Sequence, residues 1–370
     1  MGSAMNEKTT PNETDETAAL GGAVRSGDAT AFTALVERRR RELLVHCYRM
    51  LGSLSDAEDA VQETFLRAWR YRESVKEGLP LRPWLYRIAT NACLDAIARD
   101  PRRTALAASS EVGASGAGPL ADIAWLQPFP DALLEPLDPL DPIAPRDSEP
   151  EALALTRETI EIAFLTVIQR LPPLQRATLI LRDVLGWSAK ESADLLELSV
   201  AAANSALQRA RATLRKELPP RRPAWPAGVD AGDGERELVR RYVEAAERPD
   251  VSMLVSLIRE DALFRMPPDP DVGVVAGRDA ILRMFVDAGF GTEAFGRLRC
   301  VTTRANGLPA VAAFVRRAGD PAWNALAMDV LRIEEGAIAE ILTFGPDLFA
   351  AFGLPPTLEA EDESEQVAAT

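Results

Sequence analysis

The segment from residue 81 to residue 103 constrains the fold most strongly, because its apolar residues recur at intervals of three and four. These apolar residues are Leu85, Ile88, Ala89, Ala92 and Ala96. Such spacing places them on one face of a helix, which has to pack against other elements. Pro83 falls in the first turn, where proline is tolerated. The sequence therefore predicts a helix with one buried face, followed by the basic residues Arg99, Arg102 and Arg103.

A neighbouring face of the same helix carries Trp84, Arg87 and Asn91. Flat side chains stack on unpaired bases, and guanidinium groups hold phosphates. This combination suits a surface that separates DNA strands. On this segment alone, an amphipathic helix with a solvated basic end is the alternative.

Two further helices are predicted before this one, over residues 28–51 and 55–70, with Gly52 between them. The run from Ser55 to Glu58 has the spacing of a capping box. The polar side of the second helix carries Asp59, Gln62 and Glu63. This acidic face could dock a basic partner helix, although acidic residues near a helix N-terminus also favour the helix dipole.

Residues 104–151 form a linker rich in Pro, Ala, Asp and Gly, without apolar periodicity. Within it lies the sequence WLQPFPD, from Trp125 to Asp131. Aromatic residues between prolines in a polar linker indicate a docked segment. Either a partner protein or the chain's own domains could receive it.

A helix-turn-helix is predicted within residues 156–218, which are otherwise helical. A capping box from Ser188 to Glu191 opens a short helix, and a turn at 197–199 leads to a longer one. The second helix of such a motif enters the major groove. Its core stripe is expected at Val200, Ala203, Leu207, Ala210 and Leu214, and its DNA-reading face at Asn204, Ser205, Gln208, Arg209, Arg211 and Arg215. The turn lacks glycine, so Glu197 or Leu198 has to adopt the turn geometry instead, at some cost.

The last third of the chain changes from helical to mixed periodicity. Helices are expected at 235–247, 251–258 and 277–288, and strands at 262–266, 296–304, 309–317, 323–334 and 337–344. Asn306-Gly307 and Glu335-Gly336 are hairpin turn signals. The pattern predicts an α+β cone, with a pocket lined by Phe264, Met266, Phe285, Phe314, Trp323 and Met328. One by one, these residues fit a core better than a ligand contact.

Composition limits the chemistry that the chain can perform. The 370 residues carry a net charge of -14, one histidine and three cysteines without metal-binding spacing. We therefore expect several domains, no metal site and no cofactor. Catalysis by the cone is unsupported, because its candidate acids, Asp261, Asp269, Asp271 and Asp329, lack a paired partner in the sequence. No run of 18 apolar residues occurs, and the chain is expected to be cytoplasmic, with no membrane association.

Four stretches together resemble the extracytoplasmic-function sigma subunits of bacterial RNA polymerase. They are SDAEDAVQETFLRAW at 55–69, RPWLYRIATNACLD at 82–95, LPPLQRATLILR at 171–182 and NSALQRAR at 204–211. The resemblance covers about residues 28–218. It implies a non-enzymatic initiation factor that binds core RNA polymerase, at its beta-prime clamp helices and beta flap, and that recognises and melts promoter DNA. The linker would run through the polymerase cleft toward the RNA exit.

The resemblance also implies roles for individual residues. Asp56, Asp59, Gln62 and Glu63 would contact the clamp helices. Promoter contacts to the minus-ten element would come from Tyr71, Trp84, Arg87, Asn91, Arg99, Arg102 and Arg103. Contacts to the minus-thirty-five element would come from Asn204, Ser205, Gln208, Arg209, Arg211 and Arg215.

The cone is similar to the SnoaL-like, nuclear-transport-factor-like fold, through the run Phe264-Arg-Met-Pro-Pro268 and the following Gly277-Arg-Asp-Ala-Ile281. Sigma factors of the sigma-G and sigma-J kind carry such a domain, which would regulate the factor through a small-molecule effector, an anti-sigma protein or a docking surface. The predicted boundaries are a disordered tail at 1–22, two all-α sigma domains at 23–103 and 152–222 joined by the linker 104–151, a second linker at 223–234, the cone at 235–356 and an acidic tail at 357–370.

Two other functions remain open from the residues. A one-component, ligand-sensing helix-turn-helix regulator would use only the DNA-reading module. An isomerase or hydrolase fused to a DNA-binding unit would need a catalytic residue in the cone.

Overall fold

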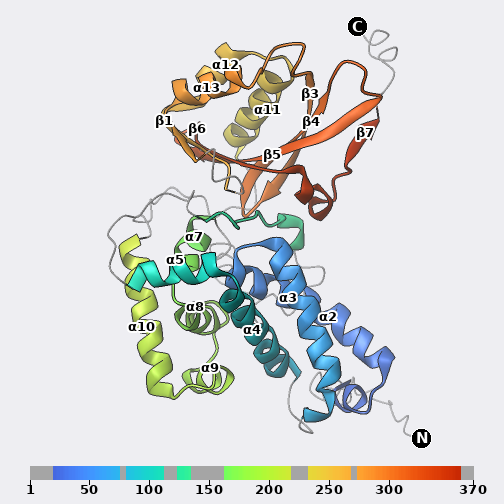
Figure 1. Cartoon of the computed structure of the whole chain (residues 1–370), viewed down its shortest axis with the longest axis vertical. Coiled ribbons are helices and arrows are strands. Elements are labelled where there is room, and N and C mark those ends of the chain that lie inside the picture. Colours follow the sequence, from blue (N-terminus) through green and yellow to red (C-terminus); the bar gives the residue numbers. More distant parts are fainter. Residues whose placement is uncertain are drawn as a thin grey trace, which may run out of the picture. The chain divides into compact units, whose positions relative to one another are not determined.

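The computed structural model describes residues 20–75, 81–111, 123–134, 162–217, 232–267 and 273–359 (Figure 1). The chain forms two compact units. The first comprises residues 1–114 and 168–216, and the second comprises residues 115–167 and 217–370. The first unit therefore combines the three predicted N-terminal helices with the helix-turn-helix, and the second combines the cone with part of the linker.

The first unit is all-helical. A short helical stretch at residues 20–25 precedes α2 (Ala29–Leu51), α3 (Leu54–Arg70), the 3-10 turn η1 (Arg72–Ser74), α4 (Leu81–Arg99) and α5 (Pro101–Glu111). The helix α7 (Ile162–Arg170) crosses the boundary between the units. The unit is completed by α8 (Pro173–Leu179), the π-helical turn η4 (Ile180–Val184), α9 (Ala189–Leu195) and α10 (Val200–Glu217).

Several local predictions for this unit are confirmed, and others are wrong. Gly52 ends α2 in the left-handed conformation, with φ of 69°. The cap of α3 is Ser53 rather than Ser55, and its hydroxyl accepts a hydrogen bond from the Asp56 amide. The helix starts earlier because Ser53 directly follows the turn at Gly52 and already has extended backbone. The helix α5 lies where the sequence predicted the start of the linker.

The C-terminal end of α2 anchors the helix-turn-helix part of this unit. The carbonyl group of Arg49 accepts a hydrogen bond from Gln169 Nε2 at 3.1 Å, and that of Met50 accepts one from Arg176 Nη1 at 2.6 Å. Arg176 is only 1 % exposed. A helix C-terminus carries unpaired carbonyl groups and a negative dipole end, so a buried guanidinium group is a suitable cap there.

The second unit is built on one sheet. Its elements are α11 (Asp233–Glu247), α12 (Val251–Leu257), β1 (Ile258–Arg265), β2 (Val274–Ala276), α13 (Arg278–Asp287), β3 (Arg297–Ala305), β4 (Leu308–Arg316), β5 (Ala322–Glu334), β6 (Ala337–Phe344), η5 (Pro346–Phe352) and β7 (Thr357–Glu359). The strand order is β2-β1-β6-β5-β4-β3, with β7 paired to β5. Only the β1–β6 pair is parallel among the described strands.

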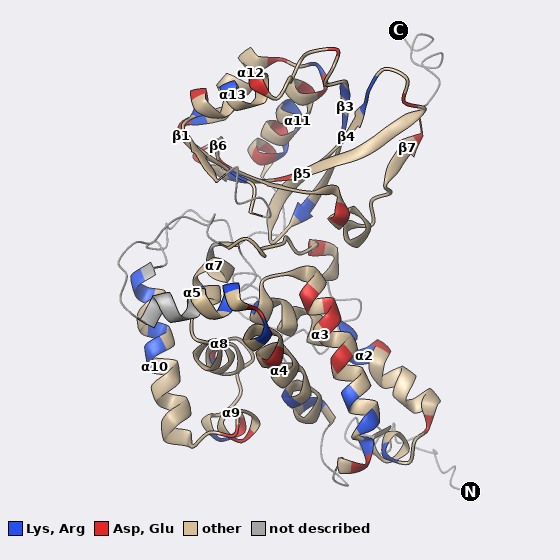
Figure 2. Cartoon of the chain, in the orientation of Figure 1, with Lys and Arg blue, Asp and Glu red and all other residues tan. Residues whose placement is uncertain are grey.

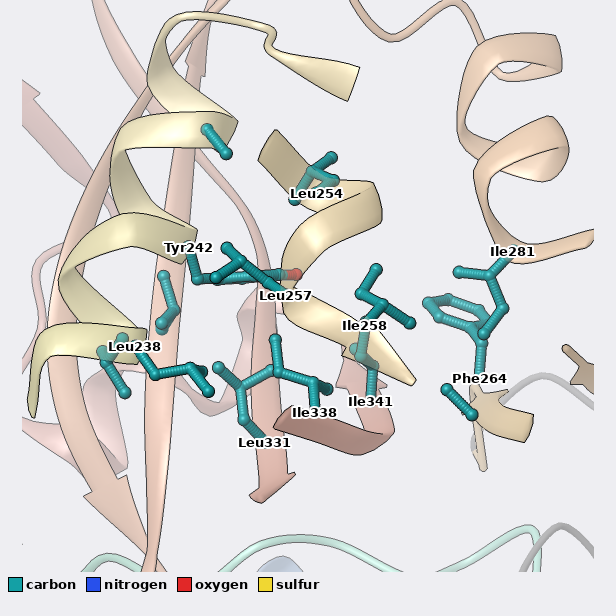
Figure 3. Packing of buried hydrophobic residues seen from close by; sticks show 14 of the residues in the cluster. Leu238, Tyr242, Leu254, Leu257, Ile258, Phe264, Ile281, Leu331, Ile338 and Ile341 are labelled. Atoms are coloured by element: carbon teal, nitrogen blue, oxygen red, sulfur yellow. The ribbon is translucent and has the colours of Figure 1, made fainter. Parts of the chain in front are cut away.

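The predicted α+β cone is confirmed. The short strands β2 and β7 were not predicted, and β1 begins at Ile258, where the sequence predicted the end of a helix. Asn306-Gly307 and Glu335-Gly336 connect their hairpins with positive φ angles at both positions, as two-residue hairpin turns require. Residues of α11, α12 and α13 pack on one face of the sheet (Figure 3). Leu238 and Tyr242 of α11 belong to the same buried cluster as Leu331 and Ile338 of the sheet.

None of the helices within the described ranges is long and apolar enough to span a membrane.

Candidate nucleic-acid interface

The acidic face predicted on α3 lines a groove of about 1150 Å³ between α3 and the α4–α5 segment. Asp56, Asp59, Gln62 and Glu63 all contribute to it, and Figure 2 shows acidic residues along α3. The groove also contains Leu66, whose side chain is 64 % exposed. The sequence prediction missed Leu66, although its position one turn after Gln62 and Glu63 places it on the polar side of the helix.

Ion pairs connect the two helices that form this groove. Arg67 bridges the two helices, because its guanidinium group lies 2.6 Å from Glu63 Oε1 and 2.8 Å from Asp95 Oδ2. Arg67 therefore links α3 and α4 along the groove. Arg67, Arg99 and Arg102 also line the groove, so a partner that docks here meets charges of both signs beside one large exposed apolar side chain.

The predicted strand-separating face lies on α4 and at the end of α3. Arg87, Asn91 and Tyr71 are exposed, and Trp84 is half-buried. Arg87 Nη2 pairs with Glu197 Oε1 at 2.6 Å, which connects this face to the turn of the helix-turn-helix. The adjacent Tyr86 is buried and packs against Trp187, with ring centroids 5.4 Å apart. The structure thus brings the two predicted DNA-reading faces into one unit.

The basic cluster after α4 divides into surface and buried residues. Arg99 and Arg102 are exposed, and Arg102 pairs with Asp100 at 3.1 Å. Arg103 is only 2 % exposed, and it donates hydrogen bonds to the Leu51 carbonyl group and to Asp56. In this structure Arg103 caps the end of α2, so the expectation that it is a surface residue for DNA is corrected. The acceptors lie about fifty positions away in the sequence, where no local pattern reveals them.

The helix-turn-helix is formed by α9 and α10. The predicted capping box is confirmed, because Ser188 Oγ accepts from the Glu191 amide and Glu191 Oε2 accepts from the Ser188 amide. Glu197 occupies the turn in the left-handed conformation, with φ of 56°. This confirms the expectation that a residue other than glycine takes up the turn geometry.

The DNA-reading face predicted on α10 is exposed throughout, at Asn204, Ser205, Gln208, Arg209, Arg211 and Arg215. Figure 2 shows the basic residues in the C-terminal half of this helix. Arg211 forms a two-pronged pair with Asp183, at 2.8 Å and 2.6 Å. An arginine holds a guanine edge with the same two-pronged geometry, so the Asp183 carboxylate stands where the guanine would bind. Val200, which was expected in the core, is 43 % exposed.

The six residues predicted to line one pocket in the cone lie on both faces of the sheet. Phe264 belongs to the cluster under the helices, and Met266 and Phe285 pack against that cluster. Asp329 lies on the same face, since it accepts a hydrogen bond from Tyr242 of α11, and neighbouring strand residues alternate faces. Met328 therefore lies on the opposite face. Phe314 packs against Phe349 of η5, and Trp323 lies under Arg316. The prediction of a single pocket is wrong, because the strand register separates these side chains.

Among the candidate acids of the cone, Asp329 is held internally by hydrogen bonds from Tyr242 at 2.9 Å and Thr343 at 2.5 Å. Desolvation raises the pKa of its carboxyl group, although these two hydrogen bonds oppose the shift. Asp261 is exposed and pairs with Arg259 at 2.8 Å. Asp269 and Asp271 lie outside the described residues.

Residues 123–134, which we call the strap, dock on the turn between β3 and β4. Asn306 Oδ1 accepts a hydrogen bond from the Phe129 amide at 2.7 Å, and the Asn306 amide donates to the Phe129 carbonyl group at 3.0 Å. Asp131 accepts from the Gly307 amide at 2.9 Å. Trp125, Leu126 and Phe129 are buried. Of the two docking partners left open by the sequence, the chain's own cone is the one found.

Known proteins match each of these parts. Family models match as Sigma-70 region 2 over residues 35–103, Sigma-70, region 4 over residues 161–214, and SnoaL-like domain over residues 239–341. The chain is 38% identical over 340 residues to the ECF RNA polymerase sigma factor SigG of Mycobacterium tuberculosis, covering 90% of this chain and 86% of that relative. It is 28% identical over 254 residues to SigJ of the same organism, covering 68% and 70% of the two chains. The crystal structure of Mycobacterium tuberculosis SigJ aligns with a TM-score of 0.51 at 23% identity, covering 87% of this chain and 100% of that one, which supports the fold.

Proposed function

Because the chain belongs to the extracytoplasmic-function (ECF) family of RNA polymerase sigma factors, we propose that it directs core RNA polymerase to promoters through the surfaces described above. The observation that carries this proposal is that one unit presents both the α3–α4 groove and an exposed recognition helix. A helix-turn-helix regulator that acts alone would need only the second of these. The match to relatives over both helical regions favours the sigma factor over that alternative.

Polymerase docking is assigned to the groove lined by Asp56, Asp59, Gln62 and Glu63. Carboxylates around Leu66 fit a basic, amphipathic helix such as those of the beta-prime clamp. An apolar side chain at the centre of such a contact supplies affinity, and the surrounding charges supply specificity and a high association rate. The helix-turn-helix module would make the second contact, at the beta flap.

Promoter contacts are assigned to the exposed members of the two predicted sets. Tyr71, Trp84, Arg87, Asn91, Arg99 and Arg102 are assigned to the minus-ten element. The minus-thirty-five element is assigned to the α10 face, Asn204, Ser205, Gln208, Arg209, Arg211 and Arg215. Arg87 and Arg211 have to leave Glu197 and Asp183 to reach DNA. Both are exposed ion pairs, which are worth only about 0–1 kcal/mol each, so DNA can replace them.

The cone is assigned a regulatory role that acts through the strap. The strap is part of the linker that the family resemblance places in the polymerase cleft, and its contacts with Asn306 and Gly307 would compete with that path. We assign no catalytic step to the cone, because its internal acid Asp329 is already engaged by Tyr242 and Thr343. A small-molecule effector or an anti-sigma protein would act by changing the occupancy of the strap contact.

Run-off transcription with purified core polymerase and a genomic promoter library tests both parts of the proposal. The full chain should give specific transcripts, and absence of transcripts together with absence of core binding would refute the sigma function. Asn306→Gly keeps the left-handed turn, which glycine adopts readily, and removes the acceptor for the Phe129 amide. We expect this variant to raise transcript yield.

The matched control is Glu335→Gly in the other hairpin turn, where φ is 53°. It makes the same kind of change away from the strap and should leave transcription unchanged. Equal yields from the two variants, or a lower yield from Asn306→Gly, would contradict regulation through the strap while leaving the sigma function intact.

A further inference from the structure

The first turn of the recognition helix exposes an apolar side chain. Val200 is the first residue of α10 and is 43 % exposed, whereas Ala203, Leu207 and Ala210 of the same helix are buried. Helical spacing alone placed Val200 with these core residues. The structure instead leaves its isopropyl group on the surface, where it costs hydration free energy unless something covers it.

Val200 lies in line with the proposed DNA-reading face of α10. Val200, Asn204, Gln208, Arg211 and Arg215 follow one another at intervals of four, four, three and four, and all of them are exposed. Residues with this spacing share one face of a helix. Val200 therefore extends the DNA-reading face by one turn toward the helix N-terminus, which is the end that contacts base edges in helix-turn-helix proteins.

The chemistry of this first turn limits what it can recognise. Val200, Ala201 and Ala202 have no polar side-chain atom, and Ser199 Oγ already accepts the Ala202 amide at 3.1 Å. Hydrogen-bonded readout by side chains within α10 therefore begins only at Asn204. In the major groove, the C5-methyl group of thymine is the apolar feature that a base presents.

We infer that Val200 contacts the C5-methyl group of a thymine in the minus-thirty-five element, and so contributes to promoter specificity. This inference rests on the proposed function and adds a residue to the α10 face. Burying one methyl group against a valine should change affinity by about 3- to 10-fold. The contact should discriminate by shape and hydrophobicity, without a hydrogen bond.

The test uses the full chain with core polymerase on a promoter that it transcribes. Each thymine of the minus-thirty-five element is replaced in turn by deoxyuridine, which lacks only the methyl group. Wild-type protein should lose about 3- to 10-fold in promoter affinity at one position. Val200→Ala should bind the thymine promoter more weakly by a similar factor and should no longer distinguish deoxyuridine at that position.

The matched control is Val251→Ala, because Val251 is also the first residue of a helix and is 37 % exposed, but lies in the cone. It should keep the wild-type preference for thymine. Alanine has a higher helix propensity than valine, so neither change should unfold its helix. Two results would overturn the inference: no thymine at which wild type senses the methyl group, or a Val200→Ala protein that still senses it. A wild-type protein that binds no promoter with core polymerase would instead refute the proposed function.

Discussion

Replacing the one histidine of the chain should flatten the pH dependence of stability of the helical unit. His46 is fully buried on α2, its Nε2 atom lies 2.9 Å from Thr90 Oγ1, and its ring packs against Tyr86. Desolvation, followed by the charges of Arg49 and Arg82, lowers its pKa from 6.5 to about 3. The unfolded chain therefore takes up a proton as pH falls through 6.5, while the folded chain stays neutral until about pH 3.

The size of this effect follows from the two pKa values. Stability falls progressively between the unfolded-state and the folded-state pKa, because in this range the unfolded chain binds a proton that the folded chain does not. Between about pH 7.5 and pH 5 this linkage removes about 2 kcal/mol from the free energy of unfolding.

Urea denaturation of the full chain, monitored by hydrogen exchange within α2 and α4, measures the free energy of unfolding of the helical unit. His46→Gln should be less stable than wild type at neutral pH, because the ring packing is lost, but should lose about 2 kcal/mol less on acidification. Thr90→Val is the control, since it removes the hydrogen-bond partner and leaves the buried imidazole. If wild type and His46→Gln lose the same free energy between the two pH values, the reasoning is wrong.

Three further changes probe other parts of the structure. Leu66→Ala should weaken binding to core polymerase by about 10-fold in a fluorescence titration, with no loss of thermal stability, because the side chain is exposed in the free protein. Arg176→Met should lower the free energy of unfolding of the helical unit by about 3 kcal/mol, since it leaves the Met50 carbonyl group buried without its donor. Asp329→Asn should raise the free energy of unfolding of the cone at neutral pH, because burial raises the pKa of Asp329 and makes its ionised carboxylate unfavourable in the folded state. This stabilisation should disappear as pH falls below the ordinary pKa range of aspartate, where the carboxyl group is protonated in both states. Denaturation curves at several pH values measure the last two effects.

Local sequence signals predicted the parts of the fold that depend on neighbouring residues. The capping box at Ser188, the turn at 197–199 and the hairpin turns at Asn306 and Glu335 all depend on two to four adjacent residues. Helical periodicity located α2, α3 and α4 for the same reason, because a helix face repeats within one turn.

Contacts between distant residues were not predictable from the sequence. Arg103 and Arg176 are residue types that usually lie on the surface, and their acceptors at the end of α2 are 52 and 126 positions away. The strap contact joins Phe129 to Asn306 across 177 positions. The aromatic residues between prolines showed that this segment would dock, but no local pattern could show where.

Strand register explains why the predicted pocket of the cone was wrong. A shift of one residue moves a side chain to the other face of the sheet, and the register shifts between Ala313 and Phe314 and between Arg332 and Ile333. The residue types showed which side chains would be buried. Only the pairing of the strands determines the face on which each of them lies.

The position of the strap within the linker determines what its release can regulate. The strap belongs to the same compact unit as the cone, whereas the residues proposed to read the two promoter elements lie in the helical unit. Release of the strap would therefore free the linker without altering either promoter-reading face. For this reason we expect Asn306→Gly to change transcript yield without changing which promoters are recognised.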